Sequence, residues 1–118
     1  MNENEPRKFR MPEWLKPYLK VEGDRRSLPV ELHLAWFREE NPDCTITTEV
    51  LTGSDMRHSV VVKATIQNGK GEIIATGHSH KATVPVGPKV DLLEEAESGA
   101  IERALAFAGF GPEFWEIS

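Results

Sequence analysis

The feature that most constrains the fold is one stretch, residues 91–111, that carries the marks of a helix with two defined ends. Asp91 and Glu94 have the spacing of a capping box, and Gly109 suits the left-handed position that follows a last helical turn. Apolar residues recur at steps of three and four and so share one face: Leu93, Ala96, Ala100, Ala104 and Phe107. Because the alanines and Gly99 keep this face small, we predict a close approach to a sheet, another helix or a neighbouring subunit.

Alternating residues predict three strands in the middle of the chain, over residues 45–51, 59–67 and 72–83. Asn68-Gly69 is typical of a tight hairpin turn, although residues 68–71 can equally form a four-residue loop. With either loop, the same residues share the apolar face of the sheet: Val60, Val62, Ala64, Ile66, Ile73, Ala75 and Gly77. The opposite face is predicted to be mixed and largely polar.

A second helix is predicted over residues 29–41, ahead of the strands. Pro29 suits the first helical position, and Val30, Leu34 and Phe37 fall on one face. Together these elements predict an α+β fold, a three-stranded antiparallel meander with helices on one face, in the order α-β-β-β-α.

Charge divides the chain into two predicted regions, an arm over residues 1–27 and a single α+β domain over residues 28–118. The arm holds seven Lys or Arg against five acidic residues, and the domain seven against fourteen. The proline-containing arm is either a partly disordered tail with a hydrophobic anchor or a basic, aromatic segment that contacts nucleic acid or a neighbouring subunit. The net charge of -5 argues against strong nonspecific binding to duplex nucleic acid.

Several classes of protein are disfavoured by what the sequence does not contain. No stretch approaches the roughly 18 apolar residues of a membrane span, and the basic N-terminus lacks the apolar segment of a signal peptide. We therefore expect a cytoplasmic protein without membrane contacts. The single cysteine, Cys44, has no partner for an internal disulfide. Because there is no phosphate-binding glycine loop and no serine elbow, we predict that the protein is not an enzyme and uses no cofactor.

One pair of histidines has the spacing of metal ligands. His78 and His80 alternate on a predicted strand and so lie on the same face. Four other residues could complete a ligand shell, namely His33, His58, Asp55 and Glu49. Two histidines alone indicate a polar surface or a ligand contact more than a metal, and no metal site is predicted.

Four blocks of sequence together resemble one known family. They are Leu28-Pro-Val-Glu-Leu-His-Leu-Ala-Trp-Phe-Arg-Glu-Glu-Asn-Pro42, Val62-Lys-Ala-Thr-Ile66, Gly71-Glu-Ile-Ile-Ala-Thr-Gly-His78 and Ala96-Glu-Ser-Gly-Ala-Ile-Glu-Arg-Ala-Leu105. In order and spacing they are similar to the Rad-fifty-two-type single-strand annealing superfamily, above all to short bacterial and phage members related to DNA damage response protein A. The resemblance covers roughly residues 28–111.

The resemblance implies a protein of recombination and DNA repair that binds and anneals single-stranded DNA as a ring or filament of identical subunits. The alternative is a non-catalytic scaffold that binds proteins and has little affinity for DNA. Phosphate contacts in such a groove require basic side chains. By position the resemblance assigns them to Arg103 and Lys63, while local charge adds His78, Lys81, Arg25 and Arg26.

Two features depart from the family's pattern. Glu102 stands where relatives usually carry a small or basic residue, and Glu31-Leu32-His33 replaces a stretch where an arginine is common. Arg103 also has an alternative role, since it can form an ion pair within the helix with Glu102 or Glu95.

Overall fold

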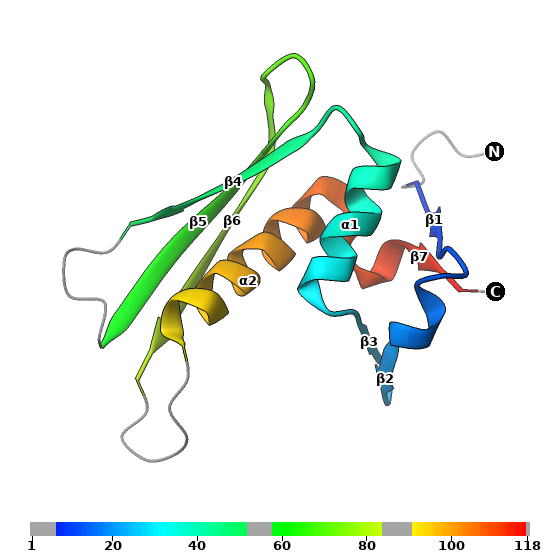
Figure 1. Cartoon of the computed structure of the whole chain (residues 1–118), viewed down its shortest axis with the longest axis horizontal. Helices are drawn as coiled ribbons and strands as arrows, with labels where there is room; N and C mark the ends of the chain where they lie inside the picture. Colours follow the sequence, from blue (N-terminus) through cyan, green and yellow to red (C-terminus); the bar gives the residue numbers. More distant parts are fainter. Residues whose placement is uncertain (1–6, 52–57, 84–90, 118) are drawn as a thin grey trace.

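The computed structural model describes residues 7–51, 58–83 and 91–117 (Figure 1). Its main elements are two helices and three long strands: α1 (Val30–Glu40), β4 (Thr45–Val50), β5 (Ser59–Gln67), β6 (Ile73–Ala82) and α2 (Leu92–Leu105). The strands form one antiparallel sheet in the order β4-β5-β6. Helix α2 lies along one face of this sheet and α1 packs against α2 (Figure 1). The predicted α+β fold, with its α-β-β-β-α order, is confirmed.

The two faces of the sheet differ as the alternation predicted over β5 and most of β6. The prediction for Ile73 was wrong, because the register shifts where Ile73 pairs with Gln67, and Ile73 is 61% exposed. On β5, Val60, Val62, Ala64 and Ile66 are fully buried, and each residue between them is half-buried. On β6, Ala75, Gly77 and Ser79 are buried on the same side, facing α2. The other face carries threonines, glutamine, lysine and histidine and remains open.

The turn between β5 and β6 is the longer of the two predicted alternatives. The Asn68 backbone N–H donates to the Glu72 carbonyl, 2.9 Å away, and the Gly71 N–H donates to the Asn68 carbonyl, 3.0 Å away. The Asn68 side chain also accepts from the backbone N–H groups of Lys70 and Glu72. Gly71 has a φ of 80°, which explains why glycine stands there. Residues 52–57 and 84–90, which lie between the predicted elements, are outside the described residues.

Small residues let α2 lie unusually close to the sheet. Ala96, Ala100 and Ala104 are fully buried. A Cβ atom built on Gly99 would lie 2.6 Å from Ser79 Oγ, and one built on Gly77 would lie 2.5 Å from the Ala100 carbonyl oxygen. The predicted close approach is therefore confirmed, and the sheet is the surface approached.

Both ends of α2 carry the predicted signals, but the helix ends earlier than predicted. The Asp91 side chain accepts the Glu94 backbone N–H at 3.1 Å, and Gly109 has a φ of 85°. After Leu105 the chain forms a wide π turn, η2 (Ala106–Phe110). Leu105 lies on the buried side of α2 itself, whereas Leu93 and Phe107 are 38% and 73% exposed. The prediction that Leu93 and Phe107 continue the buried stripe was therefore wrong.

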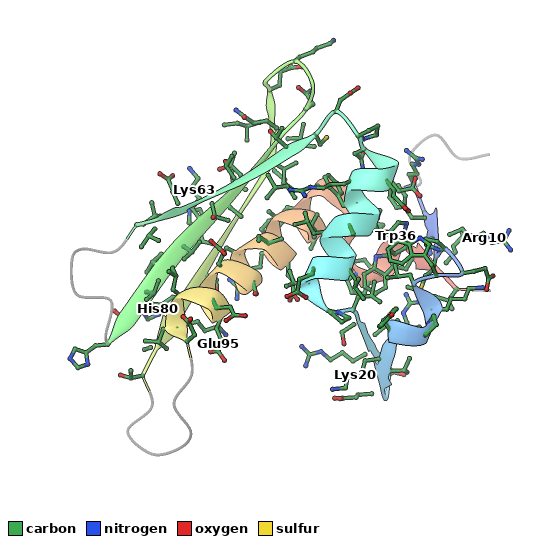
Figure 2. The ribbon with its side chains drawn as sticks, in the orientation of Figure 1. Arg10, Lys20, Trp36, Lys63, His80 and Glu95 are labelled. Atoms are coloured by element: carbon green, nitrogen blue, oxygen red, sulfur yellow. The ribbon has the colours of Figure 1, made fainter. Side chains whose placement is uncertain are left out.

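Helix α1 buries a different face from the one predicted. The buried residues are His33, Trp36 and Phe37, whereas Val30 and Leu34 are only half-buried. The reason is an aromatic cluster in which the ring centroids of Trp36 and Phe110 lie 4.7 Å apart (Figure 2). Segments distant in sequence supply this cluster, so the spacing within α1 alone did not reveal it.

The two ends of the described chain meet beside this cluster. Strand β1 (Phe9–Arg10) pairs in parallel with β7 (Trp115–Glu116), and Met11 and Leu15 are buried in the core. A short hairpin, β2 (Lys20–Glu22) and β3 (Arg25–Ser27), leads into α1. Two single 3-10 turns, η1 (Lys16–Tyr18) and η3 (Pro112–Phe114), complete the described elements. The domain boundary at residue 27 stays a prediction.

Candidate functional site

The structure divides the six predicted site residues between two sides of the molecule. Lys63 of β5 lies on the open face of the sheet, turned away from α2 (Figure 2). His78 of β6 lies opposite Lys63 across the strand pair. Glu49 of β4 is the other cross-strand neighbour of Lys63. Because the carboxylate of Glu49 lies beside the one lysine, this face has little net positive charge.

The other four residues lie on the helical side. Arg25 and Arg26 belong to β3, Lys81 lies on β6 beside α2, and Arg103 lies on α2 with its Cβ atom against Gly77. The six predicted residues therefore do not form one continuous basic surface. The alternative role of Arg103 is not found either, since none of the ion pairs among the described residues includes it.

Arg26 is bound to the protein's own backbone. Its guanidinium donates to the Pro112 carbonyl through Nη2 and, at 3.4 Å, to the Trp115 carbonyl through Nη1. These bonds connect β3 to the C-terminal segment. Arg26 thus has a structural role and is less available to an external anion than its neighbour Arg25, which is exposed.

Two cavities lie along the helical side, and Glu102 of α2 lines both. We call the first the hairpin cavity, of about 390 Å³, whose wall includes Arg25, Arg26, His33, Glu102, Glu113 and Trp115. We call the second the α2 cavity, of about 530 Å³, lined by Lys81, Asp91, Glu94, Glu95, Ser98, Gly99 and Glu102. The two cavities are neighbours, with the Glu102 side chain at their common border.

The environment of Glu102 perturbs its carboxyl group. Although the residue is exposed as a whole, partial burial of the carboxyl raises its pKa above the ordinary value, while Arg25 and Lys81 act in the opposite direction. Both cations are therefore within electrostatic range of this carboxylate. In the sequence, Glu102 stood out only as a departure from the pattern of the resembled family. Its nearness to Arg25 could not be predicted, because the two residues belong to segments far apart in the chain.

His33 contributes to the wall of the hairpin cavity from inside the core. It is only 4% exposed, and its Nε2 lies 2.7 Å from the Phe110 carbonyl oxygen. Because a carbonyl only accepts, Nε2 must carry the proton. The indole N–H of Trp115 donates to the same oxygen at 3.1 Å. Burial lowers the pKa of His33, and the bond to Phe110 opposes this shift.

The alternative of a metal site finds no geometric support in the described part of the chain. There, no three His, Cys, Asp or Glu side chains are grouped so that they could hold a metal ion. His33 is buried in the core, whereas His78 and His80 are exposed on β6. Asp55 lies outside the described residues.

The N-terminal half of α2 is strongly acidic. Its first turns and N-cap carry Asp91, Glu94, Glu95 and Glu97, with Glu102 further along. Glu97 accepts a hydrogen bond from the Thr48 hydroxyl at 2.9 Å, on the side of the helix that faces β4. These carboxylates repel a polyanion, so phosphate groups are unfavourable at the start of α2.

Comparison with known proteins gives a different family from the one that the sequence blocks suggested. A family model described as Slr1353 N-terminal dsRNA-binding domain-like matches residues 34–108, which is more than half of the chain. The resemblance to the Rad-fifty-two-type single-strand annealing superfamily was therefore wrong, and with it the prediction of single-stranded DNA annealing in recombination and repair. No functionally curated protein matches the sequence. Within the described residues, none of the helices has the length and apolar character needed to span a membrane.

Proposed function

Because the chain belongs to the Slr1353 N-terminal dsRNA-binding domain-like family, we propose that it binds double-stranded RNA. The observation that carries this proposal is the extent of the match, which runs from within α1 to the turn after α2 and so includes the whole sheet. Duplex RNA is recognised mainly by its shape and by contacts to phosphates and 2′-hydroxyls. A rigid sheet supported by a closely packed helix can hold such contacts at fixed separations.

The charge distribution restricts where the phosphates can bind. The acidic start of α2 disfavours them, whereas the β2–β3 hairpin presents the exposed Arg25, with Lys20 beside it in an ion pair with Glu22. The open sheet face adds Lys63 and His78 as a second, weaker candidate surface. With so few available cations, we expect modest affinity that decreases steeply as salt is added.

The proposal is tested by fluorescence anisotropy with a labelled RNA duplex of about 20 base pairs, long enough for the roughly 16 base pairs that a double-stranded RNA-binding domain spans. The single strands and a DNA duplex of the same sequence serve as controls. We expect the RNA duplex to bind most tightly, with a dissociation constant that rises between about 50 and 200 mM salt. Equal affinity for all ligands, or no binding at about 50 mM salt, would refute the proposal.

We also propose that the protein acts by binding alone, without catalysis. The expected result is that a labelled duplex remains intact after long incubation with the protein, with and without divalent cations. Conversion of the duplex into a shorter or chemically altered product would contradict this.

Self-association is a further part of the proposal, because β6 ends the described sheet with an unpaired edge of ten residues. Ile73 is 61% exposed on this strand, and Phe107 is 73% exposed on the turn that packs near it. Such an edge is a template for pairing with a second copy. Light scattering of the purified chain should give more than one subunit, and Ile73→Lys should lower the mass to that of a monomer.

A further inference from the structure

We propose that Arg25 and Lys81 together form a phosphate-binding position for duplex RNA, and that the carboxylate of Glu102 between them sets its affinity by competing with the phosphate. This inference rests on the proposed function and adds the site and the residue that controls it. None of the three residues is assigned a role by the family match.

Each of the two neighbouring cavities holds one of the two cations, and Glu102 borders both cavities. Arg25 lines the hairpin cavity, Lys81 lines the α2 cavity, and Glu102 lines both. The two cations belong to β3 and β6 and lie more than fifty positions apart in the sequence. Glu102 therefore occupies the position between two positive charges, where a bound anion would also be most stable.

Neither cation is neutralised by a close ion pair within the part of the chain that the structure describes. Among the described residues, ion pairs join Arg7 to Glu40, Lys16 to Glu13 and Lys20 to Glu22. Arg25 and Lys81 belong to none of them. They interact with Glu102 through space without contact, so the approach of a phosphate does not require a salt bridge to be broken.

Other acidic side chains line only one of the two cavities. Asp91, Glu94 and Glu95, for example, line the α2 cavity but not the hairpin cavity. Glu102 is the carboxylate common to both cavities, and its charge opposes a phosphate there most directly. Removing this one charge should therefore strengthen RNA binding more than removing any other on the same helix.

The test uses the full chain and the 20-base-pair RNA duplex at about 100 mM salt. Glu102→Gln should tighten binding about fivefold, as expected for removing one repulsive charge near a phosphate at the protein surface. The matched control is Glu97→Gln, which makes the same charge change on the same helix but on the side that faces β4. This control should change the affinity less than twofold.

A double-mutant cycle identifies the partner through which Glu102 acts. Arg25→Gln and Lys81→Gln should each weaken binding. Each should also reduce the slope of log affinity against log salt concentration by about one, the amount expected for the loss of one phosphate contact. In the Arg25→Gln background, the gain from Glu102→Gln should be largely lost. Circular dichroism and thermal unfolding establish that each variant is folded, and Glu102→Ala provides a second variant at the controlling position.

The outcomes separate this inference from the function on which it rests. If the wild-type chain binds the RNA duplex but Glu102→Gln and Glu97→Gln behave alike, the phosphate position is wrong and the proposed function stands. If neither the wild-type chain nor Glu102→Gln binds the duplex at about 50 mM salt, both are wrong. Tightening that persists undiminished in the Arg25→Gln and Lys81→Gln backgrounds would also overturn the assignment.

Discussion

Adding a single methyl group at Gly77 should destabilise the protein severely. A Cβ atom at this position of β6 would lie 2.5 Å from the Ala100 carbonyl oxygen and 2.9 Å from Arg103 Cβ, whereas ordinary contact begins near 3.4 Å. The first of these neighbours is helix backbone, which cannot rotate away as a side chain can. Helix α2 would have to move outward by roughly 1 Å, which also loosens the fully buried alanines beneath it.

The expected cost of Gly77→Ala follows from this geometry. Overpacking a core costs typically about 1–3 kcal/mol, and we expect the upper end because the obstacle is backbone. Alanine recovers less than about 1 kcal/mol of this by restricting the unfolded chain. For a domain of this size the melting temperature should fall by roughly 8–12 °C.

Urea unfolding followed by circular dichroism measures the effect, with Gly99→Ala as the comparison. There the added Cβ would meet only the Ser79 side chain, at 2.6 Å from Oγ and 3.1 Å from Cβ. The combined Gly99→Ala and Ser79→Ala variant should be at least as stable as the wild type, because alanine is favoured over glycine inside a helix by about 1 kcal/mol. A loss below about 0.5 kcal/mol for Gly77→Ala would refute the close packing of α2 on the sheet.

Three further predictions concern pH and helix capping. Because burial lowers the pKa of His33 in the folded state, the free energy of unfolding should be highest above about pH 6.5 and decrease as pH falls below it, by at most about 1.4 kcal/mol per pH unit. Urea unfolding at pH 7.5 and 5.5 should show this loss, which should be smaller in His33→Gln. Burial raises the pKa of Glu102, so the contribution of this group to stability is present below about pH 4.5 and is lost as pH rises through the folded-state pKa. Glu102→Gln should therefore have a higher melting temperature than the wild type at pH 7. An unchanged or lower melting temperature at pH 7 would contradict the raised pKa of Glu102. Asp91→Ala should cost about 1 kcal/mol in urea unfolding through loss of the N-cap bond to Glu94, whereas Asp24→Ala, in the turn between β2 and β3, should cost less than half of that.

The elements that the sequence predicted well are those determined by neighbouring residues. The alternation over β5 and β6 depends on a repeat of two, and it identified both sheet faces correctly except at Ile73, where the pairing shifts register. The ends of α2 depend on Asp91 and Gly109, which act within one turn. Such signals are local, so no knowledge of the tertiary structure is needed to read them.

The elements that the sequence did not predict depend on contacts between distant segments. Strands β1 and β7 have two residues each and pair across about a hundred positions, too short for any alternation to be visible. Likewise, His33 is buried because Phe110 and Trp115 pack around it, although the pattern of α1 favoured Leu34. The position of Glu102 between Arg25 and Lys81 has the same origin.

The mistaken family resemblance has a physical explanation. The residues around Gly99 and Ala100 have small side chains because α2 lies against the sheet there. Gly109 ends the helix in a left-handed conformation. Any protein that packs a final helix on a three-stranded meander in this way needs similar residues at similar spacing. The four sequence blocks that carried the resemblance therefore indicated how the helix packs on the sheet, and did not identify the family.

The parallel pairing of β1 with β7 also decides how much of the chain is needed to fold. A fragment restricted to the matched segment, residues 34–108, lacks Met11, Leu15, Phe110 and Trp115, all of them buried. It would leave Trp36 uncovered on an exposed face of α1. We therefore expect the minimal folding unit to extend beyond the matched segment at both ends, since the two ends of the described chain lie side by side (Figure 1).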